Sequence, residues 1–221
     1  MSIIAIDGPA GSGKTTVARA LADVLGLPTL ETGAMYRALT WAVLQDGRDP
    51  ADAEAVAALA RRVHIEVGDR VLVDGKDVTD ELRTPEVTAA VSAVSAVPAA
   101  RVALVACQRN WIDAHGGGVL EGRDIGTVVA PDAVLKVFLV ASEEERARRR
   151  LAQDESRAGE RLIGLPETQA DIRRRDTLDA SRAASPLTPA ADAVVLDTTG
   201  RSVDDIVAEI AGRYRAALAR P

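Results

Sequence analysis

The chain has few aromatic residues, few histidines and a single cysteine. Aromatic residues make up 2% of its 221 positions, too few for the stacking platforms that hold single-stranded nucleic acid. The lone Cys107 excludes a disulfide framework or a thiolate zinc site, and we expect it to be packed in the core. His64 and His115 are too few and too far apart for a histidine metal centre. Trp41 and Trp111 have apolar neighbours at helical spacing, which favours core positions.

No targeting or membrane-spanning segment is recognisable in the sequence. The N-terminus lacks the basic region of a secretory signal. The longest uncharged apolar stretch, residues 87–100, is too short to span a bilayer and contains Pro98. The net charge of −6 argues against a protein that binds duplex nucleic acid through a positive field. We therefore expect a cytoplasmic protein without nucleic-acid or membrane partners.

Lysine is also scarce, although the chain has 27 basic residues. Only Lys14, Lys76 and Lys136 are lysines, so nearly every positive charge is a guanidinium group. The planar guanidinium fork suits bidentate contacts to phosphate and carboxylate groups. Because hydrophobic residues are 47% of the chain and aromatics are rare, alanine, valine and leucine must build the core.

Apolar periodicity indicates strands that alternate with helices. Strands are expected at 2–7, 29–30, 119–121, 134–140 and 193–196. Helices are expected at 14–25, 34–44, 51–62, from 85 onward, 98–114, from 143 onward, 166–182 and 203–218. Residues 63–67 and 70–73 with a turn at 74–75 indicate an antiparallel hairpin, so residues 63–84 interrupt the alternation as an insertion. The alternation predicts an α/β fold with a parallel sheet covered on both faces.

The segment between the first strand and the first helix matches the phosphate-loop pattern G-x-x-x-x-G-K-[ST]. It comprises Gly8, Pro9, Ala10, Gly11, Ser12, Gly13, Lys14 and Thr15. Glycines let the backbone N–H groups turn toward an anion at a helix N-terminus. Lys14 would reach the β- and γ-phosphates, and the Thr15 hydroxyl would bind Mg²⁺. The loop predicts a nucleoside triphosphate site, but by itself it does not separate kinases from GTPases or ATPases.

Two further patterns sort these classes. None of the three lysines lies in the Asn-Lys-x-Asp signature of a GTPase. Glu121 and Asp124, after the third strand, loosely imitate the catalytic acid of a motor ATPase. In the segment 173–187, however, Arg175, Asp179 and Arg182 share one helical face. Two guanidinium groups around a carboxylate suit a ligand that carries both phosphate and hydrogen-bond donor groups.

The sequence resembles bacterial cytidylate kinases over essentially its whole length. The matching segments are AIDGPAGSGKTT (5–16), ETGAMYRA (31–38), SAVSAVPAAR (92–101), EGRDIGTVV (121–129), PDAVLKVFLVAS (131–142) and RRRDTLDASRAASPL (173–187). The segments at 121–129 and 173–187 are far more specific than the phosphate loop, which shikimate and gluconate kinases share. One conservative departure is Glu31, where the family often has Asp.

The resemblance implies a P-loop nucleoside-monophosphate-kinase fold in one domain. A five-stranded parallel core would comprise residues 1–30, 98–152 and 183–221. The monophosphate-binding region with its antiparallel insertion would span 31–97, and a lid would lie at about 153–165. The implied reaction is phosphorylation of CMP and dCMP to CDP and dCDP by a monomer, with ATP as donor and Mg²⁺ as metal.

The resemblance also implies site residues. The ATP-binding positions are Gly8, Pro9, Ala10, Gly11, Ser12, Gly13, Lys14, Thr15 and Thr16, with Arg149 packed on adenine. The monophosphate positions are Thr32, Arg37, Ser92, Arg101, Arg123, Asp124, Arg175, Asp179 and Arg182. Among these, Ser92, Asp124 and Asp179 would recognise cytosine or ribose, and Arg37, Arg123 and Arg175 would bind phosphate. The expected catalytic cations are Lys14, Arg123, Arg157 and Arg161, the last two from the lid.

Two alternatives stay open at this point. A small-metabolite P-loop kinase would share the phosphate loop but act on an acceptor such as shikimate or gluconate. A nucleotide-dependent regulatory or nucleic-acid-binding module would need no acceptor at all, and the acidic balance and the shortage of aromatics count against it.

Overall fold

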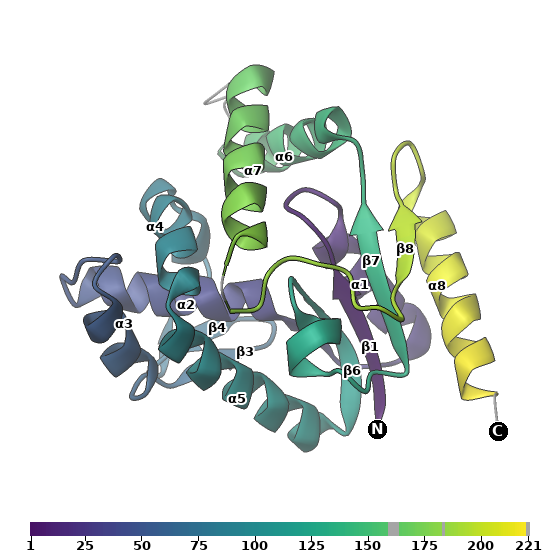
Figure 1. The fold of residues 1–221 in the computed structure, drawn as a ribbon, viewed down its shortest axis with the longest axis horizontal. Helices are drawn as coiled ribbons and strands as arrows, with labels where there is room; N and C mark the ends of the chain where they lie inside the picture. The colour runs from purple at the N-terminus through teal and green to yellow at the C-terminus, as the bar shows by residue number, and fades with distance from the viewer. Residues whose placement is uncertain (159–163, 183, 220–221) are drawn as a thin grey trace. The chain divides into compact units, whose positions relative to one another are not determined.

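The computed structural model describes residues 1–158, 164–182 and 184–219, without the side chains of Asp154 and residues 156–158 (Figure 1). The chain divides into two compact units, Met1–Thr29 with Gly117–Pro221 and Leu30–Gly116. This division places residues 98–116 in the second unit, whereas the family resemblance counts them with the core. The expected lid includes residues 159–163, which lie outside the described part of the chain.

The first unit is built on the parallel sheet that the sequence predicts. The sheet comprises β1 (Ser2–Asp7), β2 (Thr29–Glu31), β6 (Gly117–Gly122), β7 (Leu135–Val140) and β8 (Val194–Asp197), in the spatial order β2-β6-β1-β7-β8. The boundary between the two units falls within β2, after Thr29. Asp7 lies opposite Gly122 of β6 and Phe138 of β7, so the carboxyl ends of three neighbouring strands meet at one edge. Ligands of open α/β sheets bind at this edge.

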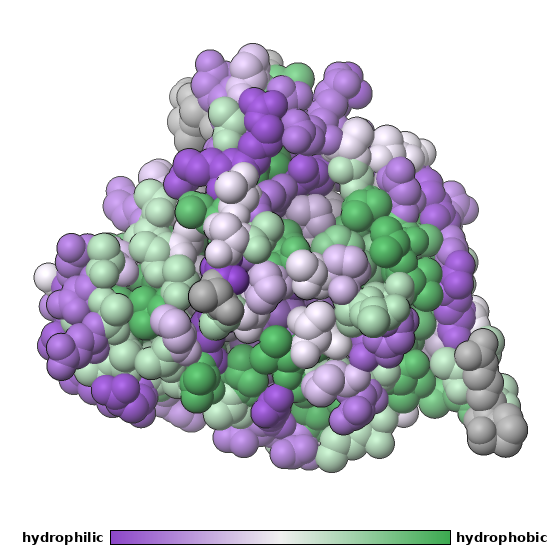
Figure 2. Space-filling view, viewed as in Figure 1, coloured by the Kyte–Doolittle hydropathy of each residue, from purple (hydrophilic) through white to green (hydrophobic). Residues whose placement is uncertain are grey.

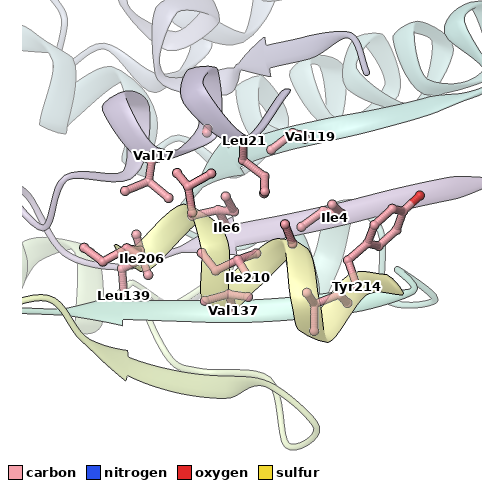
Figure 3. Close-up of a cluster of buried hydrophobic side chains, with 14 of the residues drawn as sticks. Ile4, Ile6, Val17, Leu21, Val119, Val137, Leu139, Ile206, Ile210 and Tyr214 are labelled. Carbon is pink, nitrogen blue, oxygen red and sulfur yellow. The ribbon is translucent and has the colours of Figure 1, made fainter. Parts of the chain in front are cut away.

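The α-helices that accompany the sheet in the described part of this unit are α1 (Lys14–Leu25), α6 (Glu143–Ala158), α7 (Leu165–Ala180) and α8 (Val203–Leu218). Helices α1 and α8 pack on each other and bury a cluster of branched side chains against the strands (Figure 3). The cluster includes Ile4, Ile6, Val17, Leu21, Val119, Val137, Leu139, Ile206, Ile210 and Tyr214. Isoleucine thus contributes to the core beside alanine, valine and leucine. Each fully buried isoleucine, valine or leucine side chain stabilises the fold by about 1.5–3 kcal/mol relative to an exposed one.

The second unit combines helices with a small antiparallel sheet. Its elements are α2 (Thr32–Gln45), α3 (Ala53–Ala60), β3 (Ile65–Val67), β4 (Val71–Val73), β5 (Lys76–Asp77), the 3₁₀ turn η1 (Glu81–Arg83), α4 (Pro85–Ala96) and α5 (Pro98–His115). The expected hairpin is a three-stranded sheet, β3-β4-β5. Asp74 and Gly75 both have positive φ, 49° and 79°, which suits a tight turn, and this turn leads from β4 into a third strand.

The cysteine and both tryptophans lie nearer the surface than the sequence predicts. Cys107 is exposed on α5, so the expectation of a packed thiol is wrong. Buried positions on α5 follow spacings of three and four residues that pass beside position 107. Trp111 is half-buried and stacks on His115 with ring centroids 4.2 Å apart. Trp41 is half-buried under the Lys76 ammonium group, 4.8 Å from the ring centroid.

Among the described residues, no single helix is long and apolar enough to cross a membrane. Helices α4 and α5 taken together are long and apolar enough, but they are bent by 96° at the break between them.

Candidate active site

The phosphate loop connects the carboxyl end of β1 to the N-terminus of α1, as the sequence predicts. Glycine is required by geometry at several positions of the loop, among them Gly8 and Gly13. A Cβ on Gly8 would lie 2.2 Å from the Leu139 carbonyl oxygen, so no side chain fits against β7. Gly13 caps α1 with φ of 90°, a left-handed conformation that other residues rarely adopt. The loop therefore presents the N-terminus of α1, with its partial positive charge, at the ligand-binding edge of the sheet.

Lys14 lies at the first position of α1 and is 6% exposed. Its Nζ donates a hydrogen bond to the carbonyl oxygen of Pro9 at 2.7 Å. Burial, and then the positive charge of Arg123, lower the pKa of Lys14 to about 7, while Glu121 and Asp7 act in the opposite direction. Two cations thus share a site from which water is largely excluded, an environment that favours a polyanionic ligand.

The hydroxyl group of Thr15 donates a hydrogen bond to Glu121 Oε1 at 2.9 Å. Glu121 ends the apolar run of β6 and is 5% exposed. Among the described residues no group of three or more His, Cys, Asp or Glu side chains could hold a metal ion. Mg²⁺ needs only one or two protein oxygens when phosphates supply the rest. A hydroxyl beside a buried carboxylate fits this requirement. The phosphate-loop pattern predicts the hydroxyl of Thr15, but for the carboxylate the sequence offers only the position of Glu121 at the end of a strand.

Asp7, the last residue of β1, fixes the loop that follows β6. Its Oδ1 accepts the N–H of Ile125 at 2.9 Å, and its Oδ2 accepts the N–H of Gly126 at 2.8 Å. These residues begin η2 (Ile125–Val129), a single π-helical turn. Burial raises the pKa of Asp7 to about 6, against the two backbone hydrogen bonds, and the charge of Asp124 adds to the rise. Asp7 thereby orients the segment that carries Arg123 and the buried Asp124.

We expect the stability of the chain to depend on pH through Asp7. The carboxyl group of Asp7 binds its proton more tightly in the folded chain than in the unfolded chain, where the pKa of aspartate is 3.8. Between pH 4 and 6 the folded state is therefore favoured by protonation of Asp7. As the pH rises from 4 to 7, the free energy of unfolding should fall by up to about 3 kcal/mol through this group. Asp7→Asn should lack that fall. Urea unfolding of both proteins across this range measures the difference, and parallel profiles would contradict the assignment.

Arg123, Asp179 and Arg182, three of the expected monophosphate-binding residues, form a contiguous cluster. Arg123 Nε donates to Asp179 Oδ2 at 2.9 Å, and Arg182 Nη2 lies 2.8 Å from Asp179 Oδ1. Burial alone would raise the pKa of Asp179, but the guanidinium groups of Arg123 and Arg182 lower it below its usual value. The Asp179 carboxylate is therefore ionised and oriented by two cations.

Arg175 lies on α7 beside this cluster. Burial and the charges of Arg123 and Arg150 lower its pKa. Within the described residues, the Arg175 guanidinium makes no hydrogen bond or ion pair, although its charge interacts with those of Asp171 and Asp179. A half-buried arginine next to another cation is poised to bind an anion.

Arg149 of α6 is held over the end of the phosphate loop. Its Nε donates to Glu145 at 2.9 Å, and its Nη1 and Nη2 donate to the hydroxyl and carbonyl oxygens of Thr198 at 2.9 and 2.7 Å. A Cβ on Gly13 would lie 3.5 Å from Arg149 Nη1, so the guanidinium is adjacent to the loop. Thr198 is fully buried, and its hydroxyl lies 3.0 Å from the Val140 carbonyl oxygen and 3.3 Å from the Ser12 carbonyl oxygen. In the sequence, Thr198 is marked only by its place at the end of the last strand, which matches the family.

In the second unit, two expected monophosphate-binding residues lie on α2. Thr32 begins the helix and is buried. Arg37 is buried one turn further along, where its Nη1 donates to the Leu82 carbonyl at 3.0 Å and to the Thr88 hydroxyl at 3.1 Å. The side chain of Arg37 is therefore held by η1 and α4.

The other two expected residues of this unit lie on α4 and α5. Arg101 is 3% exposed, its Nη1 donates to the Ser95 carbonyl at 3.2 Å, and its guanidinium lies 5.0 Å from the centroid of the Tyr36 ring. Ser92 is half-buried on the preceding helix, and its carbonyl accepts the Ser95 hydroxyl at 3.2 Å. Arg101 is thus oriented by both α4 and α2.

Several other expected residues carry no described contact to a ligand site. Arg161 lies outside the described residues, as does the side chain of Arg157. Thr16 is exposed on the first turn of α1. Many remaining arginines are surface charges: Arg148 pairs with Glu144 four residues away on α6. The surface that Figure 2 shows around α6 and α7 is mostly hydrophilic. The two side chains of this pair are 63% and 58% exposed, so solvent screens the pair and it contributes little to stability.

Comparison with known proteins decides the family. The family model described as cytidylate kinase matches residues 4–216. The chain belongs to the cytidylate kinase family. A cytidylate kinase of Mycobacterium leprae is 50% identical over 94% of this chain and 93% of its own length. Another from Limosilactobacillus reuteri is 49% identical over 94% of this chain and 92% of its own.

Among solved structures, a gluconokinase from Sinorhizobium meliloti aligns with a TM-score of 0.50 over 99% of this chain and 93% of its own. At 17% identity this likeness shows the fold alone. The cytidylate kinase resemblance of the sequence is confirmed, and with it a phosphotransferase that takes small-molecule nucleotide substrates.

Proposed function

We propose that this chain transfers the γ-phosphoryl group of ATP to CMP and dCMP, giving ADP with CDP or dCDP. The observation that carries the proposal is that two groups of functional residues occur together in the first unit. A phosphate loop with a buried lysine and a carboxylate held between arginines belong to the same compact unit. The family match over residues 4–216 supports the same reaction.

In the proposed reaction the chain binds, orients and stabilises charge. Phosphoryl transfer leaves a protein little covalent work, so catalysis rests on positioning and on cations near the transferring group. Lys14 and the phosphate loop would hold the β- and γ-phosphates, while Thr15 and Glu121 would hold Mg²⁺. Mg²⁺, when bound, supplies positive charge to the phosphate oxygens. No side chain has to remove a proton, because the acceptor oxygen of a monophosphate is already anionic.

On the acceptor side, we propose that Arg123 and Arg175 bind the monophosphate and that Asp179 recognises cytosine. An ionised carboxylate accepts a hydrogen bond from the exocyclic amine of cytosine. Uracil presents a carbonyl oxygen at the same position, so two hydrogen-bond acceptors would face each other. In a buried site this mismatch strongly favours CMP over UMP. By the resemblance, Asp124, Arg182 and the second-unit residues Thr32, Arg37, Ser92 and Arg101 also belong to monophosphate binding.

A coupled assay of ADP release tests the proposal. CMP and dCMP are expected to give the fastest turnover, UMP and AMP slower turnover, and gluconate and shikimate no turnover above the ATP-only control. Equal rates with CMP and AMP would remove the claim of cytosine recognition. Turnover with gluconate or shikimate but not with CMP would favour the small-metabolite kinase.

The proposal also includes a monomeric chain that acts in the cytoplasm with no nucleic-acid or membrane partner. These points stay predictions from the sequence and the family. Light scattering of the purified chain at several concentrations gives its mass in solution, for which 23.2 kDa is expected.

A further inference from the structure

Ala10 of the phosphate loop is held at both of its backbone polar groups by two side chains from distant helices. Its N–H donates to Asp176 Oδ1 on α7 at 3.1 Å. Its carbonyl oxygen accepts from Arg146 Nη1 on α6 at 3.1 Å. The same Nη1 also donates to Asp176 Oδ2, which closes a ring of three interactions. The first turn of the loop is therefore tied to α6 and α7 together.

The surroundings make this ring tight. The side chain of Arg146 is 8% exposed and that of Asp176 is 20% exposed. At the next residue, Gly11, a Cβ would lie 2.8 Å from the Arg146 carbonyl oxygen, so the loop lies directly against the backbone of α6. A lone carboxylate so close to a phosphate site would repel a triphosphate, and the guanidinium group of Arg146 offsets that charge.

Helix α7 also carries groups of the proposed acceptor site. Arg175 precedes Asp176, and Asp179, paired with Arg123, follows three residues later. One helix therefore contacts the phosphate loop through Asp176 and carries acceptor-binding groups at the preceding residue and about one turn further on. A displacement of about 1 Å between reacting groups can lower a rate about 100-fold.

We propose that Arg146 and Asp176 are positioning residues for phosphoryl transfer, which hold the phosphate loop in register with α7. The inference rests on the proposed function, since it assigns the two residues to the donor side of that reaction. Neither side chain has to touch the substrate: they act through the backbone of Ala10. In the sequence, Asp176 is marked only by its place next to Arg175 in the string RRRD (173–176), and Arg146 only by its place in the arginine-rich run 146–150 of α6.

The test compares Asp176→Ala with Arg173→Ala. Arg173 links the same two helices through an exposed ion pair with Glu143 at 3.3 Å and, unlike Asp176, makes no described contact with the loop. Asp176→Ala is expected to weaken ATP binding about tenfold and to lower kcat about 10- to 100-fold, with the Kd for CMP unchanged. Arg173→Ala should change each value less than twofold. Calorimetric titration of ATP without acceptor measures the donor side by itself.

A double-substitution cycle separates positioning from independent effects. If the two side chains act as one unit, the double variant Arg146→Ala with Asp176→Ala should lose no more ATP affinity and no more kcat than the worse of the two single variants. Should the alanine variant fail to fold, Asp176→Asn keeps an acceptor for the Ala10 N–H and is expected to give an intermediate loss of ATP affinity.

The inference is overturned if folded Asp176 variants bind ATP and turn over like the wild type, or if Arg173→Ala causes the same losses. Failure of the wild type to phosphorylate CMP would count against the proposed function instead, because the ATP titration needs no acceptor.

Discussion

Replacing Lys14 with alanine is expected to lower kcat by about three orders of magnitude. The Lys14 ammonium is buried at the first turn of α1. The other two lysines are engaged elsewhere, Lys136 with Asp192 and Lys76 with the Trp41 ring. The loss of Lys14 removes a cation from the position where charge builds on the transferring phosphate. It also removes one of the cations that oppose the charges of Glu121 and Asp7. Single-turnover measurements with saturating ATP and CMP give the chemical step directly.

Lys76→Ala is the matched control for this experiment. Lys76 is exposed on β5 and lies over the Trp41 ring, so its removal should leave kcat within twofold of the wild type. Circular dichroism should show that both variants are folded. If folded Lys14→Ala retained most of its activity, the role assigned to Lys14 would be wrong.

Replacing Asp179 with alanine should instead damage the acceptor side. The expected result is a fall of about 100-fold in kcat/KM for CMP, with the KM for ATP changed less than twofold. The reason is that the carboxylate is the acceptor proposed for the cytosine amine and the shared partner of Arg123 and Arg182. Without it, two adjacent guanidinium groups repel each other in a largely buried cluster.

Asp204→Ala provides the matched control, because Asp204 is an exposed aspartate in the first turn of α8. Its removal should leave the KM for CMP unaltered. Asp179→Asn is a second informative variant: an amide offers uracil a donor where cytosine met an acceptor, so the preference for CMP over UMP should narrow. An unchanged KM for CMP in Asp179→Ala would refute the assigned role.

The sequence predicts the regular elements of the first unit closely. Helices α1 and α8 have the expected bounds, because apolar periodicity coincides with local signals at their ends. Gly26 ends α1 in a left-handed conformation, and the Ser202 hydroxyl accepts the N–H of Asp205 at the start of α8. Thr84 likewise caps α4, although at 3.5 Å. These signals depend on neighbours in sequence, so they can be read without the fold.

Tertiary pairs could not be predicted in this way. Asp176 and Ala10 are 166 positions apart, and nothing local marks them as partners. Asp7 directly precedes the phosphate loop, yet its hydrogen bonds reach η2. The third strand of the small sheet was missed because Lys76–Asp77 is too short and too polar for a periodic signal. The face on which Cys107 lies depends on packing around α5 rather than on spacing alone.

The measurement that tests the central claim most directly is ³¹P nuclear magnetic resonance of the purified chain with ATP, Mg²⁺ and CMP. We expect the β-phosphorus signal of CDP to grow in step with that of ADP, one CDP for each ATP consumed. Lys14→Ala should suppress both signals together. Formation of ADP and inorganic phosphate without CDP would contradict the assignment of this chain as a kinase that acts on CMP.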